Sequence, residues 1–221
     1  MCDREILTKP PGYFNGLRQD MLKYLPGHPG KSLEFGCGDG GFSTLLKERF
    51  GTETWAVELD ETAAHKAAEK LDKVISADAL EAVGQLPDNY FDVIIFFDIL
   101  EHLADPYHLL SEVKAKLAKE GIVVASIPNV RYWRVLVELV VHGNWEYKSH
   151  GVLDKTHLRF FTRKSIGKMF EESGFEILTL EGIHPTHSRT FRMLNAIFLN
   201  AIADARYKHF AVVARPSKRD P

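Results

Sequence analysis

Glycines recur at alternate positions in the segment Glu34-Phe35-Gly36-Cys37-Gly38-Asp39-Gly40-Gly41, between a short apolar run and a helical pattern. Because Gly36, Gly38 and Gly40 carry no side chains, the main chain there can approach an adenosyl group closely. The helix that follows presents free backbone N–H groups, which favour a negatively charged group such as a carboxylate. The segment therefore predicts a nucleotide-type ligand held between a strand and a helix.

Acidic residues extend this site. Glu58 lies 22 positions after Gly36, at the end of the next expected strand, where a carboxylate can accept hydrogen bonds from both ribose hydroxyls. Asp78 follows the third strand and can bind an adenine amino group. The glycine spacing also matches the dinucleotide fingerprint, so an NAD-dependent oxidoreductase is an alternative. Glu34 favours a methionine-bearing ligand instead, because an acid at that position suits an ammonium group.

Two histidines could act as a general base for an oxygen nucleophile of high pKa. His102 lies in the run Asp98-Ile99-Leu100-Glu101-His102-Leu103, directly after an uninterrupted apolar strand. Glu101 either orients His102 or starts a solvated helix. His157 lies in a polar stretch before Phe160 and Phe161. His150, Asp154 and His157 also have metal-ligand character, but their spacing is not specific and we expect no metal.

Positioning these residues requires strands and helices in alternation, which predicts a parallel sheet covered by helices on both faces. Strands are expected at 32–35, 54–58, 74–76, 91–97, 121–126, 175–181 and 210–214. Helices are expected at 13–25, 42–50, 61–71, 106–118 and 164–172. Two long segments, 129–162 and 184–207, interrupt the alternation and are expected to cap the site.

The amino-acid composition narrows the kinds of function that the chain can have. The chain has 221 residues, of which 45% are apolar and 26% charged, and we expect one domain over residues 1–221. A net charge of −2 gives no electrostatic case for nucleic-acid binding. Its two cysteines form no disulfide framework, so we expect a reducing, cytoplasmic location. No apolar run is long enough for an integral membrane segment.

Five segments together resemble, in order and spacing, the motifs of class I S-adenosylmethionine-dependent methyltransferases. They are 34–40, 57–60, 77–79, 91–94 and 98–103. The resemblance covers residues 13–183. It implies an α/β, Rossmann-like fold with a seven-stranded sheet in the order 3-2-1-4-5-7-6, strand 7 being antiparallel, and helices on both faces. It also implies S-adenosyl-L-methionine as the cofactor.

The resemblance assigns cofactor contacts along the first two strands. Glu34 and Gly36 would meet the methionine part, and Gly38 would underlie the adenosine. Glu58 would hold the ribose, with Leu59 beside the adenine.

Further contacts follow from the same resemblance. Asp78 would bind the adenine amino group, with Ala79 next to it. Asp98 would lie where the fourth strand reaches the reacting centre, as both a cofactor-binding and a catalytic residue. Tyr13 and Arg18 would close over the cofactor, and Arg18 would pair with its carboxylate.

The acceptor is less constrained. The run 98–103 resembles ubiquinone-type methyltransferases, whereas the segment 143–162 resembles a lid found in enzymes of bacterial glycan assembly. We expect a small-molecule or glycan acceptor, with O-methylation of a sugar or glycolipid hydroxyl. Quinone, lipid or carboxylate acceptors, and a non-catalytic nucleotide-binding module, are alternatives. A homodimer through the capping helices is a further hypothesis.

Overall fold

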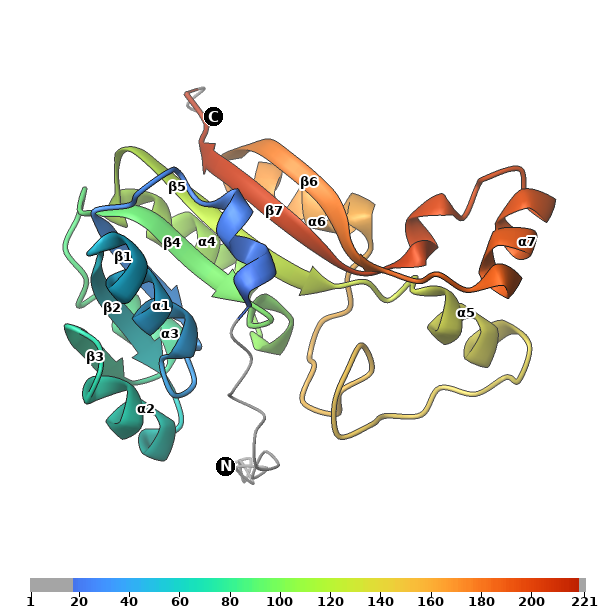
Figure 1. The fold of residues 1–221 in the computed structure, drawn as a ribbon, viewed down its shortest axis with the longest axis horizontal. Helices are drawn as coiled ribbons and strands as arrows, with labels where there is room; N and C mark the ends of the chain where they lie inside the picture. Colours follow the sequence, from blue (N-terminus) through green and yellow to red (C-terminus); the bar gives the residue numbers. More distant parts are fainter. Residues whose placement is uncertain (1–17, 219–221) are drawn as a thin grey trace.

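The computed structural model describes residues 18–218 (Figure 1). Seven strands form one sheet in the order β3-β2-β1-β4-β5-β7-β6. The first five are parallel, and β7 runs antiparallel to both β5 and β6. This is the expected sheet. The strands are β1 (Lys31–Phe35), β2 (Glu53–Glu58), β3 (Lys73–Ser76), β4 (Phe91–Phe97), β5 (Leu117–Pro128), β6 (Phe175–Pro185) and β7 (Tyr207–Pro216).

Helices cover both faces of the sheet. The α-helices are α1 (Gly41–Phe50), α2 (Glu61–Ala68), α3 (Ala79–Val83), α4 (Pro106–Val113), α5 (Trp133–Val140), α6 (Arg163–Glu172) and α7 (Arg189–Ile197). The 3-10 helices are η1 (Gln19–Tyr24), η2 (Leu100–His102), η3 (Lys114–Lys116) and η4 (Ala203–Arg206). Since side chains alternate along a strand, Ile94 and Phe96 of β4 pack with α3, α4 and α6. Val93 and Ile95 pack with η1 and α1 on the opposite face.

Three expected helices differ from the structure. The helix expected at 61–71 ends at Ala68. Of the helix at 13–25, the described part is the 3-10 helix η1, while residues 13–17 lie outside the described residues. The helix expected at 106–118 ends at Val113. Leu117 is buried and pairs with Phe91 as β5 begins, so strand pairing overrides the helical pattern there. The short helix α3, which Asp78 caps, was not expected.

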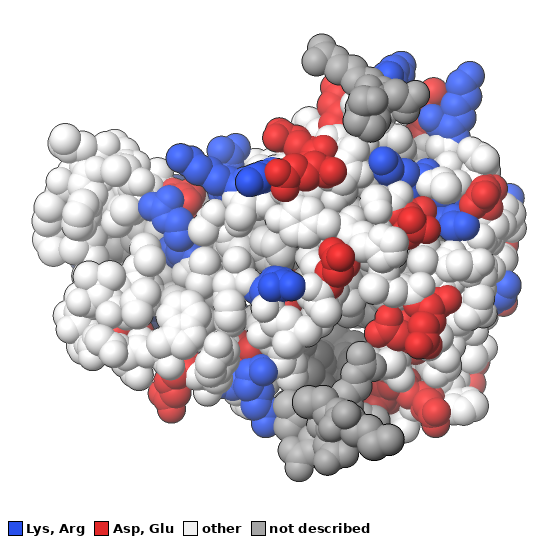
Figure 2. Space-filling view, turned by 180° about the vertical axis from the view of Figure 1, so that it is seen from behind, with Lys and Arg blue, Asp and Glu red and all other residues white. Residues whose placement is uncertain are grey.

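The two capping segments lie beyond the ends of β5 and β6, at the right of Figure 1. The segment 129–162 contains α5, and the connection between β6 and β7 contains α7. In Figure 2 this end of the molecule shows few charged groups, while acidic and basic groups are interspersed over the rest of that face. It carries exposed apolar side chains, namely Leu139, Val140, Val141, Met193, Ile197, Phe198 and Leu199. Self-association through this end stays a prediction.

None of the described helices combines the length and the apolar character that crossing a bilayer would require.

Candidate active site

The glycine loop joins β1 to α1 with left-handed backbone angles. Gly36, Gly38 and Gly40 have φ values of 69°, 57° and 81°, a region that L side chains rarely adopt. A Cβ on Gly36 would also lie 2.8 Å from Cδ1 of Ile99, so the loop packs directly against the segment that follows β4. Glycine is therefore required here both by the backbone angles and by the close packing of the loop.

Glu58, the last residue of β2, ties this loop to the sheet. Its Oε2 accepts a hydrogen bond from the Gly38 N–H at 2.7 Å, and its Oε1 accepts one from the Asp60 N–H at 3.0 Å. Burial raises the pKa of the carboxyl, and these backbone hydrogen bonds oppose that shift. A carboxylate has about four lone-pair sites, so these bonds leave room to accept from a ribose hydroxyl. The next residue, Leu59, is 59% exposed and offers an open apolar face.

Asp78 and Ala79 lie where β3 gives way to α3. Oδ1 of Asp78 accepts a hydrogen bond from the Leu80 N–H at 2.9 Å and caps the helix. Ala79 is the first helical residue and is partly buried. The cap fixes the position of the carboxylate, but its adenine contact stays a prediction.

Glu34 is buried in β1 beneath the loop. Its Oε2 accepts a hydrogen bond from the hydroxyl of Ser43 at 2.6 Å. Burial raises the pKa of Glu34 to about 7, against the effect of this hydrogen bond. Ser43, the third residue of α1, was not expected in the site, although a serine one turn into the helix that follows the loop is the available signal.

This pKa predicts that affinity for an adenosyl ligand rises with pH. A carboxyl that is protonated in the free protein must ionise to pair with the ligand's ammonium group. Below pH 7, affinity should therefore rise about tenfold per pH unit and then level off. Calorimetric titration with S-adenosylhomocysteine from pH 5.5 to 7.5 measures this slope. In Glu34→Gln the slope should vanish, and an unchanged slope in that variant would assign the titration to another group.

Asp98 begins the turn after β4, with a φ of 54°. Its carboxylate accepts hydrogen bonds from Nη1 of Arg18 and, at 3.2 Å, from the hydroxyl of Ser126. Oδ1 also lies 3.6 Å from Nε2 of His209. Burial would raise the pKa of Asp98, but the His209 and Arg18 charges and these hydrogen bonds hold it below the usual value. Because burial lowers the pKa of His209 to about 4, Arg18 carries the positive charge at neutral pH.

Tyr13 lies outside the described residues. Arg18 lies at the carboxyl end of β4, where it binds Asp98, and its pairing with a cofactor carboxylate stays a prediction. Its Nε and Nη2 are buried and have no hydrogen-bond partner among residues 18–218. Two buried N–H donors beside the loop fit a bidentate contact with a carboxylate such as that of a methionine tail. Since an ionised carboxylate paired with a guanidinium is a weak base, we expect Asp98 to position Arg18 rather than to remove a proton.

Glu101 differs from the expectation of a solvated helix start, because its side chain is 1% exposed. It lies in η2, and its carbonyl oxygen accepts hydrogen bonds from the N–H groups of Leu158 and Arg159 at 2.9 and 3.0 Å. In the described part of the chain, neither carboxylate oxygen has a hydrogen-bond partner. Burial and the nearby Asp98 charge raise the pKa of Glu101 well above its usual value. The turn after β4 thus holds a buried acid, whereas the sequence had suggested only an acid that orients His102 or starts a solvated helix.

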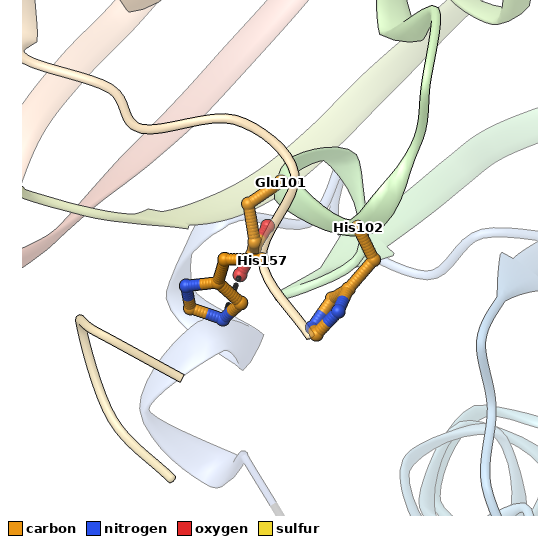
Figure 3. Close-up of side chains that lie close together, drawn as sticks. All are labelled: Glu101, His102 and His157. Carbon is orange, nitrogen blue, oxygen red and sulfur yellow. Dashed lines mark ion pairs between the residues drawn. The ribbon is translucent and has the colours of Figure 1, made fainter. Parts of the chain in front are cut away.

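His102 and His157 come together beside Glu101, as Figure 3 shows. Their ring centroids are 4.7 Å apart and the rings are nearly perpendicular. Nδ1 of His157 lies 3.1 Å from the Val152 carbonyl oxygen, and Nδ1 of His102 lies 3.2 Å from the Thr156 carbonyl oxygen. Since a carbonyl only accepts, each Nδ1 must carry the hydrogen, which leaves Nε2 of the neutral ring as an acceptor.

His150 and Asp154, which the sequence grouped with His157 as possible metal ligands, do not join the cluster of Glu101, His102 and His157. His150 is exposed and contacts the hydroxyl of Ser149. Asp154 is buried, and its Oδ1 accepts hydrogen bonds from the N–H and the hydroxyl of Thr156. The segment 129–162, called the lid below, therefore contributes His157 to the site, while its Asp154 stabilises the turn that contains Thr156.

Comparison with known proteins identifies the family. A model of a methyltransferase domain matches residues 12–180. A probable S-adenosylmethionine-dependent methyltransferase of Mycobacterium tuberculosis is 33% identical over 97 residues, 44% of this chain and 35% of that protein. This chain thus spans about a third of that relative's length. A ubiquinone biosynthesis O-methyltransferase of Pseudomonas aeruginosa is 26% identical over 215 residues, 92% of this chain and 90% of that protein.

Solved structures show the same fold. A SAM-dependent methyltransferase from Archaeoglobus fulgidus superposes with a TM-score of 0.64 at 23% identity, covering 88% of this chain and 89% of that one. A methyltransferase from Mesorhizobium loti gives a TM-score of 0.64 at 22% identity, covering 90% and 100%. The family match sets aside the oxidoreductase alternative. By sequence, this chain belongs to the methyltransferase-domain family, and its sheet has the strand order that the resemblance implied.

Proposed function

We propose that this protein transfers a methyl group from S-adenosylmethionine to a hydroxyl oxygen of a small-molecule acceptor. The main support is that the lid places the His157 ring against the His102 ring. This contact lies at the end of β4 where the glycine loop packs on Ile99. Both rings keep Nε2 as an acceptor. A pair of bases beside a methyl-donor loop suits an acceptor whose proton must be removed.

The cofactor supplies an electrophilic methyl group on a sulfonium, so the protein's part is alignment and proton removal. Glu58 and Arg18 would fix the two ends of the cofactor. The acceptor oxygen bonds to the methyl carbon as the carbon–sulfur bond breaks, and the bonding pair stays on sulfur. The hydroxyl proton passes to Nε2 of His102 or His157.

For the acceptor we propose a sugar or glycolipid hydroxyl. Support comes from the aromatic lid, where Trp145 packs edge-on against Phe160 with centroids 5.4 Å apart. Trp145 and Tyr147 are 37% and 54% exposed, which leaves ring surface for stacking on a sugar face. A quinol-type phenol is the second candidate, favoured by the Pseudomonas relative named for ubiquinone biosynthesis. A cytoplasmic location stays a prediction from the cysteine content.

The proposal predicts that His102→Ala lowers turnover by about 10²–10⁴-fold while cofactor affinity stays within about twofold of wild type. Formation of S-adenosylhomocysteine is measured against a panel of sugars, glycolipids and catechols. His108→Ala, an exposed histidine on α4, is the matched control and should retain full turnover. Wild-type turnover in His102→Ala would refute the base assignment, and turnover on catechols alone would select the second acceptor.

A further inference from the structure

We propose that Glu101, His102 and His157 together bind a divalent first-row transition-metal ion at the acceptor side of the site. One candidate ligand atom from each residue lies within 4.8 Å of the others (Figure 3). The three come from two distant segments, the turn η2 and the lid, which the backbone contacts of Glu101 with Leu158 and Arg159 hold together. The ion's role in methyl transfer rests on the proposed function, whereas its binding does not.

The Glu101 carboxylate is the strongest sign of a missing partner. It is buried, and within residues 18–218 neither of its oxygens accepts or donates a hydrogen bond. Buried polar groups in folded proteins are almost always paired, because leaving one unpaired is costly. Oε1 points toward Nε2 of His157 at 3.9 Å, which is too long for a hydrogen bond. Two metal–ligand bonds of about 2.0–2.2 Å each can span that separation.

Both histidines are held in the tautomer that a metal site needs. Metal-ligating imidazoles usually donate their other ring N–H to a carbonyl or carboxylate, which fixes the ring and its tautomer. Nδ1 of His157 has the Val152 carbonyl at 3.1 Å, and Nδ1 of His102 has the Thr156 carbonyl at 3.2 Å. The Thr156 hydroxyl donates to Asp154 at 2.7 Å, so its oxygen can also accept from Nδ1 of His102 at 3.1 Å.

The donor set indicates the type of ion. Two imidazoles and one carboxylate suit zinc, manganese, iron or cobalt, whereas magnesium and calcium prefer oxygen ligands throughout. The nearby Asp154 carboxylate adds negative charge, and the Asp98 charge is balanced by Arg18. Three protein ligands leave at least one position open. An acceptor hydroxyl bound there would have a lowered pKa, so its proton would leave to solvent. With the ion bound, the two Nε2 atoms would act as ligands and would no longer act as bases.

Binding of zinc to the full-length protein after treatment with EDTA tests the site. Calorimetric titration with Zn²⁺ alone should show one ion per chain in wild type. Affinity should fall by about 100-fold or more in Glu101→Gln and in His157→Ala. His150→Ala removes an exposed lid histidine and should bind zinc like wild type. Visible absorption of Co²⁺, titrated in place of zinc, should appear in wild type and be lost in Glu101→Gln.

The outcomes separate the two proposals. Absence of bound zinc in wild type, or equal affinity in all variants, overturns the metal site. Each variant should keep its thermal shift with S-adenosylhomocysteine, which shows that the fold survives. If zinc binds as expected and no acceptor is methylated, the proposed function fails while the metal site stands. If EDTA-treated, zinc-free protein methylates acceptors at the full rate, the ion's role in the reaction is refuted.

Discussion

Replacing Glu58 by alanine should lower affinity for S-adenosylhomocysteine by about 100-fold. The carboxylate holds the Gly38 and Asp60 N–H groups and would also accept the ribose hydroxyls. Hydrogen bonds to a charged group contribute about 1.5–3 kcal/mol each, and 1.4 kcal/mol corresponds to a tenfold change in affinity. The loop would lose a bond that fixes Gly38 as well as the ligand contacts. Isothermal titration with S-adenosylhomocysteine measures the change.

Glu61→Ala is the matched control, because Glu61 is an exposed acid three residues further along, in the first turn of α2. Its affinity should equal that of wild type. Circular dichroism should show that Glu58→Ala is still folded at the titration temperature. Wild-type affinity in a folded Glu58→Ala would mean that the cofactor does not engage the end of β2.

Glu101→Met should stabilise the metal-free protein by about 1–3 kcal/mol while reducing methyl transfer by at least about 100-fold. Methionine fills a similar volume and removes a buried carboxyl group that has no hydrogen-bond partner among the described residues. Replacing buried charged groups with apolar side chains is often stabilising. Gained stability with lost activity is the pattern of a residue kept for function. Urea denaturation in the presence of EDTA, with turnover measured separately, tests both parts.

Glu112→Met, on the exposed face of α4, is the control, and its stability and turnover should stay close to those of wild type. A Glu101→Met protein that is less stable than wild type would show that the carboxyl group supports the fold. Full turnover in that variant would remove Glu101 from the reaction. Either result would contradict the role assigned to this acid.

Sequence patterns predicted the fold because each signal was local. The apolar run at β4, the glycine loop and the positions of Glu58 and Asp78 indicated successive strands along the chain and predicted a cofactor side. Sheet order 3-2-1-4-5-7-6 then followed from resemblance, and the structure confirms it. The predicted end of α4 was wrong because Leu117 pairs with Phe91 in the sheet. Helical periodicity does not report such a long-range contact.

The acceptor side was only partly predictable. His102 and His157 were named as candidates, but nothing local indicated that their rings lie 4.7 Å apart. Glu101 was named beside His102, but its burial was not predicted, since the polarity of an acid beside a histidine gives no sign that it is buried. His209 and Ser126, which contact Asp98, belong to neighbouring strands and become visible only when the sheet is assembled. The part of the site that depends on contacts between distant segments therefore could not be predicted from the sequence.

The central claim is that the glycine loop with Glu34 and Glu58 binds S-adenosylmethionine. A thermal-shift titration of the wild-type protein with S-adenosylhomocysteine and, separately, NAD tests it most directly, because a ligand that binds only the native state raises the melting midpoint. S-adenosylhomocysteine should raise the midpoint in a concentration-dependent way, and NAD should leave it unchanged. A shift with NAD and none with S-adenosylhomocysteine would contradict the assignment of the site.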